Sequence, residues 1–120
     1  MKLFLLASLL FLCSCTSTIS KQFTPPLASQ IWPYSQQMDA IGNQSDTLAV
    51  IYLQVRKKID PENLQRLLIL DSIRYYYYRS AEFLIGTGYF TEADVYIDQL
   101  HKILDAMYSI IKIEQEKQST

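Results

Sequence analysis

The clearest helical pattern in the chain lies in residues 91–116, TEADVYIDQLHKILDAMYSIIKIEQE. Its apolar residues recur every three or four positions, and its charged residues fall between them on the opposite side of a helix. Thr91 and Asp94 have the spacing of a capping box, with Asp in place of the usual Glu. The pattern predicts an amphipathic helix over residues 92–116 that packs one broad apolar face on its neighbours. The members of that face are Ala93, Tyr96, Ile97, Leu100, Ile103, Leu104, Met107, Tyr108, Ile110 and Ile111.

Two further helices are predicted upstream of this one. Asp60-Pro61-Glu62 supplies a capping Asp, a Pro at the first helical position and an acidic first turn, which predicts a helix over residues 61–85. This helix is apolar all round, so we expect it to lie centrally, with a neighbour on either side. Another helix is expected to start with Ser45 as N-cap and to pack one apolar stripe. That stripe contains Leu48, Ile51, Tyr52, Val55 and Ile59.

The short connections between these helices indicate how they are arranged. Almost no chain separates the first two, so they are expected to be antiparallel neighbours. The next turn, Gly88 to Tyr96 (GYFTEADVY), resembles the inter-repeat segment of tetratricopeptide repeats. The resemblance covers nine residues with no second copy, and it implies a helical hairpin. The fold class predicted for residues 45–120 is therefore all-α, a small antiparallel three-helix bundle.

The first residues read as an export signal. Met1-Lys2 precedes ten residues, Leu3 to Leu12, in which only Ser8 is polar, a stretch too short to span a bilayer as a helix. Leu12-Cys13-Ser14-Cys15 then resembles the lipobox of bacterial lipoproteins. The alternative is an ordinary secretory signal with two incidental cysteines.

The lipobox resemblance has consequences for chemistry and location. It implies removal of residues 1–14 as a lipoprotein signal peptide and attachment of diacylglyceryl and palmitate-type acyl chains at Cys15. Two or three acyl chains hold a protein stably on a membrane. A mature chain that begins at Cys15 contains no free thiol for a disulfide or for catalysis. By resemblance, Thr16 favours the periplasmic face of the outer membrane within the cell envelope.

Residues 15–44 are expected to form a lipid-anchored tether of mostly extended chain, because they contain Pro25-Pro26 and Trp32-Pro33. A short helix is expected over residues 35–41. Trp32 and Tyr34 are unusual in a spacer. Either the second half of the tether docks on the helical core, or Trp32 and Tyr34 form an interaction motif or lie among lipid headgroups.

Composition excludes several classes of function. The net charge of −1 lacks the basic field needed for nucleic-acid binding, and two Cys with one His do not make a metal centre. His101, between Asp98 and Asp105, admits an acid–base or metal role, but an idle surface His is expected. No nucleophile with a base, phosphate loop or carboxylate pair appears, so we expect no enzyme activity and no cofactor. Two charge pairs, Asp71–Arg74 and Arg79–Glu82, are expected to be structural.

The nine tyrosines bear most on function. Tyr75 to Tyr78 point about 100° apart on a helix, so some of them must face a second surface or a partner. The candidate partner-binding residues are Trp32, Tyr34, Tyr75 and Tyr78. The predicted function is a membrane-anchored interaction or assembly factor of the cell envelope that binds an envelope protein; self-association is left open. In size and layout it resembles secretion-system pilotins and accessory lipoproteins.

Two alternatives remain open from the sequence. One is a plasmid- or phage-type exclusion or immunity lipoprotein. The other is a lipoprotein that binds a small apolar ligand, which would need a cavity lined by Tyr76, Phe83 and Met107.

Overall fold

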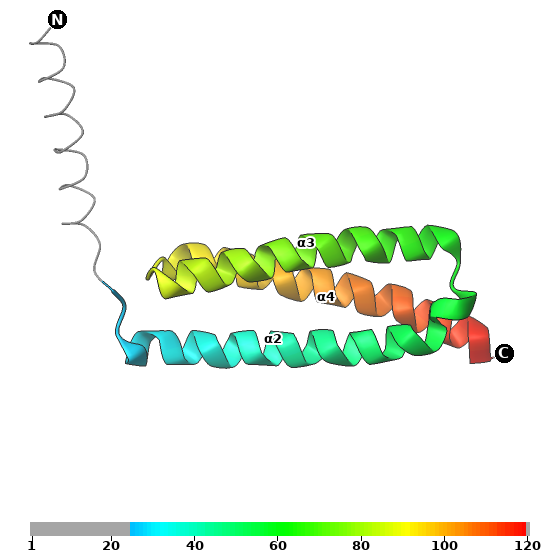
Figure 1. Ribbon diagram of the computed structural model, residues 1–120, viewed down its shortest axis with the longest axis horizontal. Helices are drawn as coiled ribbons and strands as arrows, with labels where there is room; N and C mark the ends of the chain where they lie inside the picture. Colours follow the sequence, from blue (N-terminus) through cyan, green and yellow to red (C-terminus); the bar gives the residue numbers. More distant parts are fainter. Residues whose placement is uncertain (1–24, 120) are drawn as a thin grey trace, which may run out of the picture.

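The computed structural model describes residues 25–119, which form three long α-helices and one short 3₁₀ turn. The helices are α2 (Ala28–Val55), α3 (Pro61–Gly86) and α4 (Phe90–Ser119), and η1 (Arg56–Lys58) follows α2. Figure 1 shows α2 and α4 running in the same direction, with α3 antiparallel to both. The predicted all-α three-helix bundle is confirmed. The α3 and α4 bounds lie within three residues of those expected.

The helix that holds the bundle together is α4, so the expectation that α3 lies centrally is wrong. Eight side chains of α4 are buried, whereas α3 buries three and α2 four. The difference arises because α4 concentrates its apolar residues on one broad face, which accepts α3 on one side and α2 on the other. The fully buried large side chains are Ile41, Leu100, Leu104, Ile111 and Glu114.

The first helix begins at Ala28 and not at Ser45, so residues 28–44, expected to be tether, form the first half of α2. Pro33 lies in the second turn, where its missing N–H removes one backbone hydrogen bond. Tertiary packing outweighs that loss, because Met38 and Ile41 extend the buried stripe and Tyr34 packs against it. Before the first turn, Leu27 N–H donates to Gln30 Oε1 at 2.9 Å. The possibility that this segment docks on the core is the one that the structure shows.

The connection from α2 to α3 has the features expected from the sequence. After the 3₁₀ turn, Ile59 is extended and Asp60 Oδ1 accepts a hydrogen bond from Glu62 N–H at 3.2 Å. Pro61 occupies the first helical position, as predicted. At the same end of the bundle, Gln118 Nε2 donates to the Val55 carbonyl at 3.0 Å, which fixes the end of α2 to the end of α4.

The turn from α3 to α4 depends on Gly88, whose φ is 85°. Gly88 N–H donates to Ile85 O at 3.1 Å and Tyr89 N–H donates to Leu84 O at 2.8 Å, the two bonds of a Schellman motif. Ala93 N–H donates to Tyr89 O at 3.0 Å, so Tyr89 and not Thr91 precedes the helix. A Cβ on Gly88 would lie 3.7 Å from Pro26. The described chain therefore begins beside the α3–α4 turn, at the end opposite η1 (Figure 1).

Candidate functional site

The outer side of α3 carries large apolar side chains that no other described element covers. We name this set the α3 apolar surface. Its members are 38–68% exposed: Leu68, Ile69, Ile73, Tyr75, Tyr76 and Phe83. On a helical wheel Ile69, Tyr76 and Phe83 lie opposite Leu67, Ala81 and Ile85, which face α4 and α2. The other three members, Leu68, Ile73 and Tyr75, lie on the two flanks of this open side. The apolar character of α3 on all sides therefore reflects one packed face and one open face.

The size of this surface sets it apart from scattered exposed residues. Tyr75, Tyr76 and Phe83 are 60%, 61% and 68% exposed, which corresponds to roughly 400 Å² at ~150–250 Å² per aromatic side chain. The aliphatic members add to this area. Large apolar patches rimmed by polar groups mark binding surfaces on soluble domains, where the largest patch is typically ~300–600 Å².

The aromatic half of the surface is hollowed. A shallow depression of about 450 Å³ lies between α3 and α4, lined by Tyr76, Phe83 and Tyr96 among others. Tyr77 packs against one of the lining residues, because its ring meets Tyr96 edge-on at 5.3 Å between centroids. Arg79 at the rim pairs with Glu82 at 3.6 Å, and both side chains are substantially exposed. Rigid aromatic walls with a polar rim are the usual features of a protein-binding hot spot.

The structure separates the four candidate partner-binding residues. Trp32 on α2 is 64% exposed and Tyr75 on α3 is 60% exposed, but they lie on different helices. Tyr34 is half-buried and stacks on Phe90 at 4.9 Å between ring centroids. Tyr78 is half-buried against α2, where a Cβ on Gly42 would lie 3.8 Å from its hydroxyl. Contacts within the bundle thus engage Tyr34 and Tyr78.

The surroundings of these two tyrosines affect their ionisation. Partial burial, together with a hydrogen bond to the Asp94 carboxylate, raises the pKa of Tyr34. Partial burial and the nearby carboxylates of Glu82 and Asp39 raise the pKa of Tyr78. Both hydroxyls therefore stay protonated at neutral pH, and that of Tyr34 donates to Asp94.

Sequence reasoning missed Phe83, Leu68 and Ile69 as surface residues. The signal that could have found Phe83 and Ile69 is their angular position, because both lie on the side of the helix away from Leu67 and Ala81, whereas Leu68 lies on a flank. An apolar residue on that side has no neighbour once α4 takes the central position.

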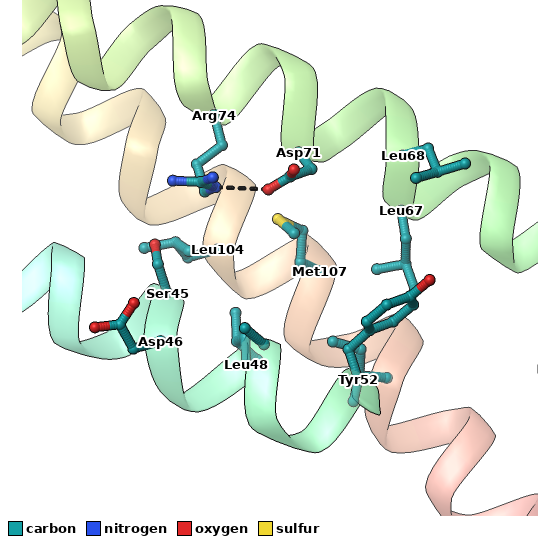
Figure 2. A pocket seen from close by; sticks show the side chains of 12 residues that line it. Ser45, Asp46, Leu48, Tyr52, Leu67, Leu68, Asp71, Arg74, Leu104 and Met107 are labelled. Atoms are coloured by element: carbon teal, nitrogen blue, oxygen red, sulfur yellow. Dashed lines mark hydrogen bonds and ion pairs between the residues drawn. The ribbon is translucent and has the colours of Figure 1, made fainter. Parts of the chain in front are cut away.

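A second hollow, which we name the α2–α3 groove, lies between α2 and α3 over α4 and has a volume of about 320 Å³. Figure 2 shows Met107 and Leu104 of α4 at its base. This location corrects the cavity expected from the sequence, since Met107 lines the groove but Tyr76 and Phe83 line the depression on the other side of α3. The reason is that α2 and α3 both pack on α4 and diverge from one another.

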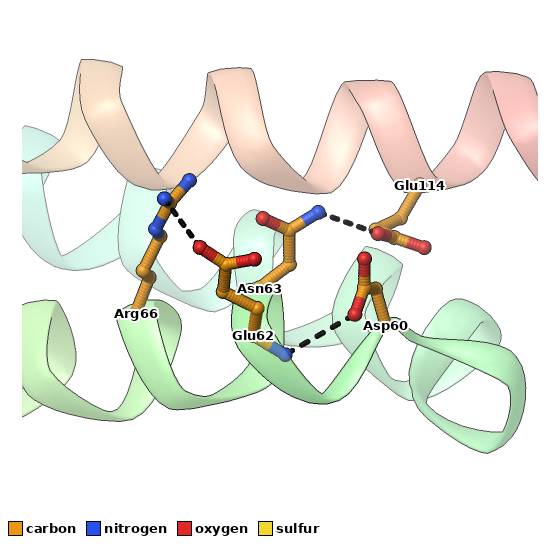
Figure 3. A network of polar contacts seen from close by, with 5 residues as sticks. All are labelled: Asp60, Glu62, Asn63, Arg66 and Glu114. Carbon is orange, nitrogen blue, oxygen red and sulfur yellow. Dashed lines mark hydrogen bonds and ion pairs between the residues drawn. The ribbon is translucent and has the colours of Figure 1, made fainter.

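A polar cluster joins α3 to the C-terminal part of α4 (Figure 3). Asn63 Nδ2 donates to Glu114 Oε1 at 2.6 Å, and Glu114 is only 1% exposed. Lys117 Nζ lies 3.8 Å from the same oxygen. On the neighbouring turn, Arg66 pairs with Glu62 at 2.8 Å in an exposed position. The cluster is closed to solvent at Glu114, so it fixes the helices and offers no site for a ligand.

The other charges predicted as structural pairs are paired. Arg74 Nε donates to Asp71 Oδ1 at 2.9 Å, and Arg79 pairs with Glu82 as described. His101 is exposed on α4, while its neighbour Asp98 pairs with Lys102 at 3.2 Å. Among residues 25–119 no group of three or more His, Cys, Asp or Glu is placed to hold a metal ion.

The predictions about membrane attachment stay predictions. Cys15 lies outside the described residues, and so do the signal peptide and the first part of the tether. None of the helices in the described part of the chain combines the length and the apolarity needed to cross a bilayer. Comparison with known proteins adds no assignment: the chain matches no family model, no curated protein and no solved structure.

Proposed function

We propose that this protein is a lipid-anchored helical interaction factor of the cell envelope that binds a partner protein through the α3 apolar surface. The observation that carries the proposal is the exposure of three aromatic and three aliphatic side chains on the open side of one helix, with Ile69, Tyr76 and Phe83 opposite its packed face. Leaving this area in water is unfavourable by about 25 cal/mol per Å². A partner that covers it recovers that free energy, which gives the exposed face a physical role.

The chemistry of the surface favours a protein as the occupant. Ser72, Arg79 and Ser80 lie among the apolar residues, so a partner has hydrogen-bonding groups to meet as well as an apolar patch. Tyr and Phe in a depression are typical anchors of protein interfaces, which bury roughly 800 Å² on each side. The aromatic rings alone provide on the order of half of that area.

The proposed lipid anchor is compatible with access to this surface. The described chain begins beside the α3–α4 turn, whereas α3 extends about 39 Å from that end at 1.5 Å per residue. Cys15 precedes Pro25 by ten positions, which span at most ~36 Å when extended. A protein held through Cys15 can therefore present the side of α3 to a neighbour at the membrane.

The anchor is tested by metabolic labelling with an alkyne analogue of palmitate. We expect Cys15→Ser to abolish labelling and to release the protein from the membrane fraction. The matched control is Cys13→Ser, which changes the other cysteine of the lipobox and should leave both readouts intact. Label retained by Cys15→Ser would place the acylation elsewhere and would refute the proposed anchor.

Partner binding is tested by purification of the tagged full-length protein from solubilised membranes. We expect a partner in stoichiometric amount, which is lost when Phe83→Arg introduces a charge into the depression. Val50→Arg is the matched control, because Val50 is 57% exposed on α2, outside the α3 apolar surface. The proposal would be refuted if the tagged wild-type protein were recovered without a partner, or if the Phe83→Arg variant retained the partner.

A further inference from the structure

The α2–α3 groove has a long apolar section and one polar end. Leu48 and Tyr52 line it from α2, Leu67 from α3, and Met107 and Ile111 from α4. Its volume of about 320 Å³ is at the lower end of the range for small-molecule sites, ~300–1,000 Å³. This volume and the apolar lining favour an aliphatic chain as the occupant.

The polar end contains a hydroxyl that the bundle leaves unsatisfied. Ser45 Oγ is buried and has no hydrogen-bond partner in the described residues. Buried polar atoms are nearly always hydrogen-bonded, so an unpaired one requires an explanation. Figure 2 shows the Ser45 side chain on the groove side of α2, facing the α3 wall.

Arg74 approaches the same end from α3. Its side chain is only 22% exposed and its Nε donates to Asp71 Oδ1, so the terminal nitrogens of the guanidinium are directed along the groove wall (Figure 2). A guanidinium carries five N–H donors, of which the pair with Asp71 uses one. Ser45 and Arg74 together therefore offer hydrogen-bond donors from two helices at one end of an apolar trough.

We propose that the α2–α3 groove binds a fatty acyl chain, with its carbonyl oxygen accepting hydrogen bonds from Ser45 and Arg74 and its tail lying along Leu48 and Met107. The groove is lined by two aspartates, Asp46 and Asp71, against one arginine. A neutral acyl ester thus meets less repulsion than a free carboxylate, so esters should bind at least as tightly as the acid. This site shares Leu68 with the partner surface proposed above, but Ser45, Ala49 and Met107 line the groove and do not belong to the α3 apolar surface.

The test uses full-length protein reconstituted in phosphatidylcholine vesicles. Laurate and methyl laurate, each with a diazirine in the chain, are photolysed with it, and the adducts are mapped by mass spectrometry. We expect competable adducts on the peptides that contain Leu48 and Met107. Ala49→Trp should reduce them at least tenfold by filling the groove from its exposed rim, whereas Val50→Trp on the outer side of the same helix should stay within twofold.

The outcomes distinguish acyl esters from free fatty acids, and they distinguish failure of the groove proposal from failure of the proposed function. Labelling by the ester alone, or by both compounds, supports an acyl site and identifies whether esters or free acids are its source. Labelling by the acid alone would overturn the charge argument, and adducts unaffected by Ala49→Trp would overturn the site. The same result is expected in a Cys15→Ser background and with Phe83→Arg, so failure of the proposed function would not change this readout.

Variants of Ser45 and Arg74 test their proposed contacts with the ligand, because ligand affinity and stability are measured separately. Ser45→Ala removes the unsatisfied hydroxyl, so the ligand-free protein should unfold at a higher temperature while its affinity for methyl laurate falls about threefold to tenfold. Arg74→Met, which keeps an apolar side chain of similar length, should lower the affinity by a similar factor. Unchanged affinity in both variants would refute the roles assigned to Ser45 and Arg74.

Discussion

The hydrogen bond between Asn63 and Glu114 gives the sharpest stability prediction. Asn63→Ala removes the donor that lies 2.6 Å from a carboxylate that is 1% exposed. Lys117 Nζ, at 3.8 Å and on a side chain that is 57% exposed, is too far from Oε1 to replace that hydrogen bond. The carboxylate is then left buried without its closest donor.

The magnitude follows from the charge and the burial. Hydrogen bonds to charged groups contribute ~1.5–3 kcal/mol, so we expect Asn63→Ala to lower the free energy of unfolding by about 2 kcal/mol. The matched control is Arg66→Ala on the next turn. It removes a 2.8 Å bond to Glu62, but the two side chains are 60% and 71% exposed, so the expected loss is at most ~0.5 kcal/mol.

Urea unfolding followed by far-ultraviolet circular dichroism measures both values. The double variant Asn63→Leu with Glu114→Met replaces both polar partners by apolar groups and should recover most of the loss. If Asn63→Ala costs no more than Arg66→Ala, Glu114 is not the buried acceptor described above, and the assignment of this cluster as a structural lock is refuted.

Three further predictions concern the turn, a tyrosine and the open face. Gly88→Ala should destabilise the protein by about 1 kcal/mol or more because φ is 85°, whereas Gly86→Ala, where an added Cβ meets nothing within 4 Å, should be neutral or stabilising by urea unfolding. Because the folded-state pKa of Tyr34 is raised, its contribution to stability is present below pH ~10 and is lost as pH rises through the folded pKa; Tyr34→Phe should therefore flatten the alkaline loss of stability measured by unfolding at increasing pH. Phe83→Ser should change stability by less than ~1 kcal/mol because two thirds of its side chain is already exposed, whereas Leu104→Ala in the core should cost ~2–5 kcal/mol; similar losses for both would show that Phe83 belongs to the core.

The sequence predicts α3 and α4 well because local signals and packing agree there. Asp60 and Pro61 mark the start of α3, and Gly88 marks the turn between α3 and α4. The apolar stripe expected for α4 matches its buried face. The first half of α2 could not be predicted because Pro33 and Gly42 disfavour a helix locally. Its stability comes from contacts with α3 and α4, which a single sequence does not display.

The candidate site could be predicted only in part. The tyrosine run predicts that some of these side chains point away from the packed face, and Tyr75 is 60% exposed. Periodicity alone does not place Phe83, because a helix that is apolar on all sides is either covered on every side or has one open face. Which of the two holds depends on the broad stripe of α4, which takes the central position and leaves α3 with a free side.

Partner binding through the α3 apolar surface is tested most directly by a photo-cross-linking scan along α3 in native membranes. p-Benzoylphenylalanine is placed singly at Ile69, Tyr76 and Phe83, which share the open face, and at the exposed control positions Val50 on α2 and Val95 on α4. We expect one cross-linked partner, identified by mass spectrometry, from all three α3 positions and from neither control. Equal cross-linking at Val50 and Val95, or none along α3, would contradict partner binding through this surface.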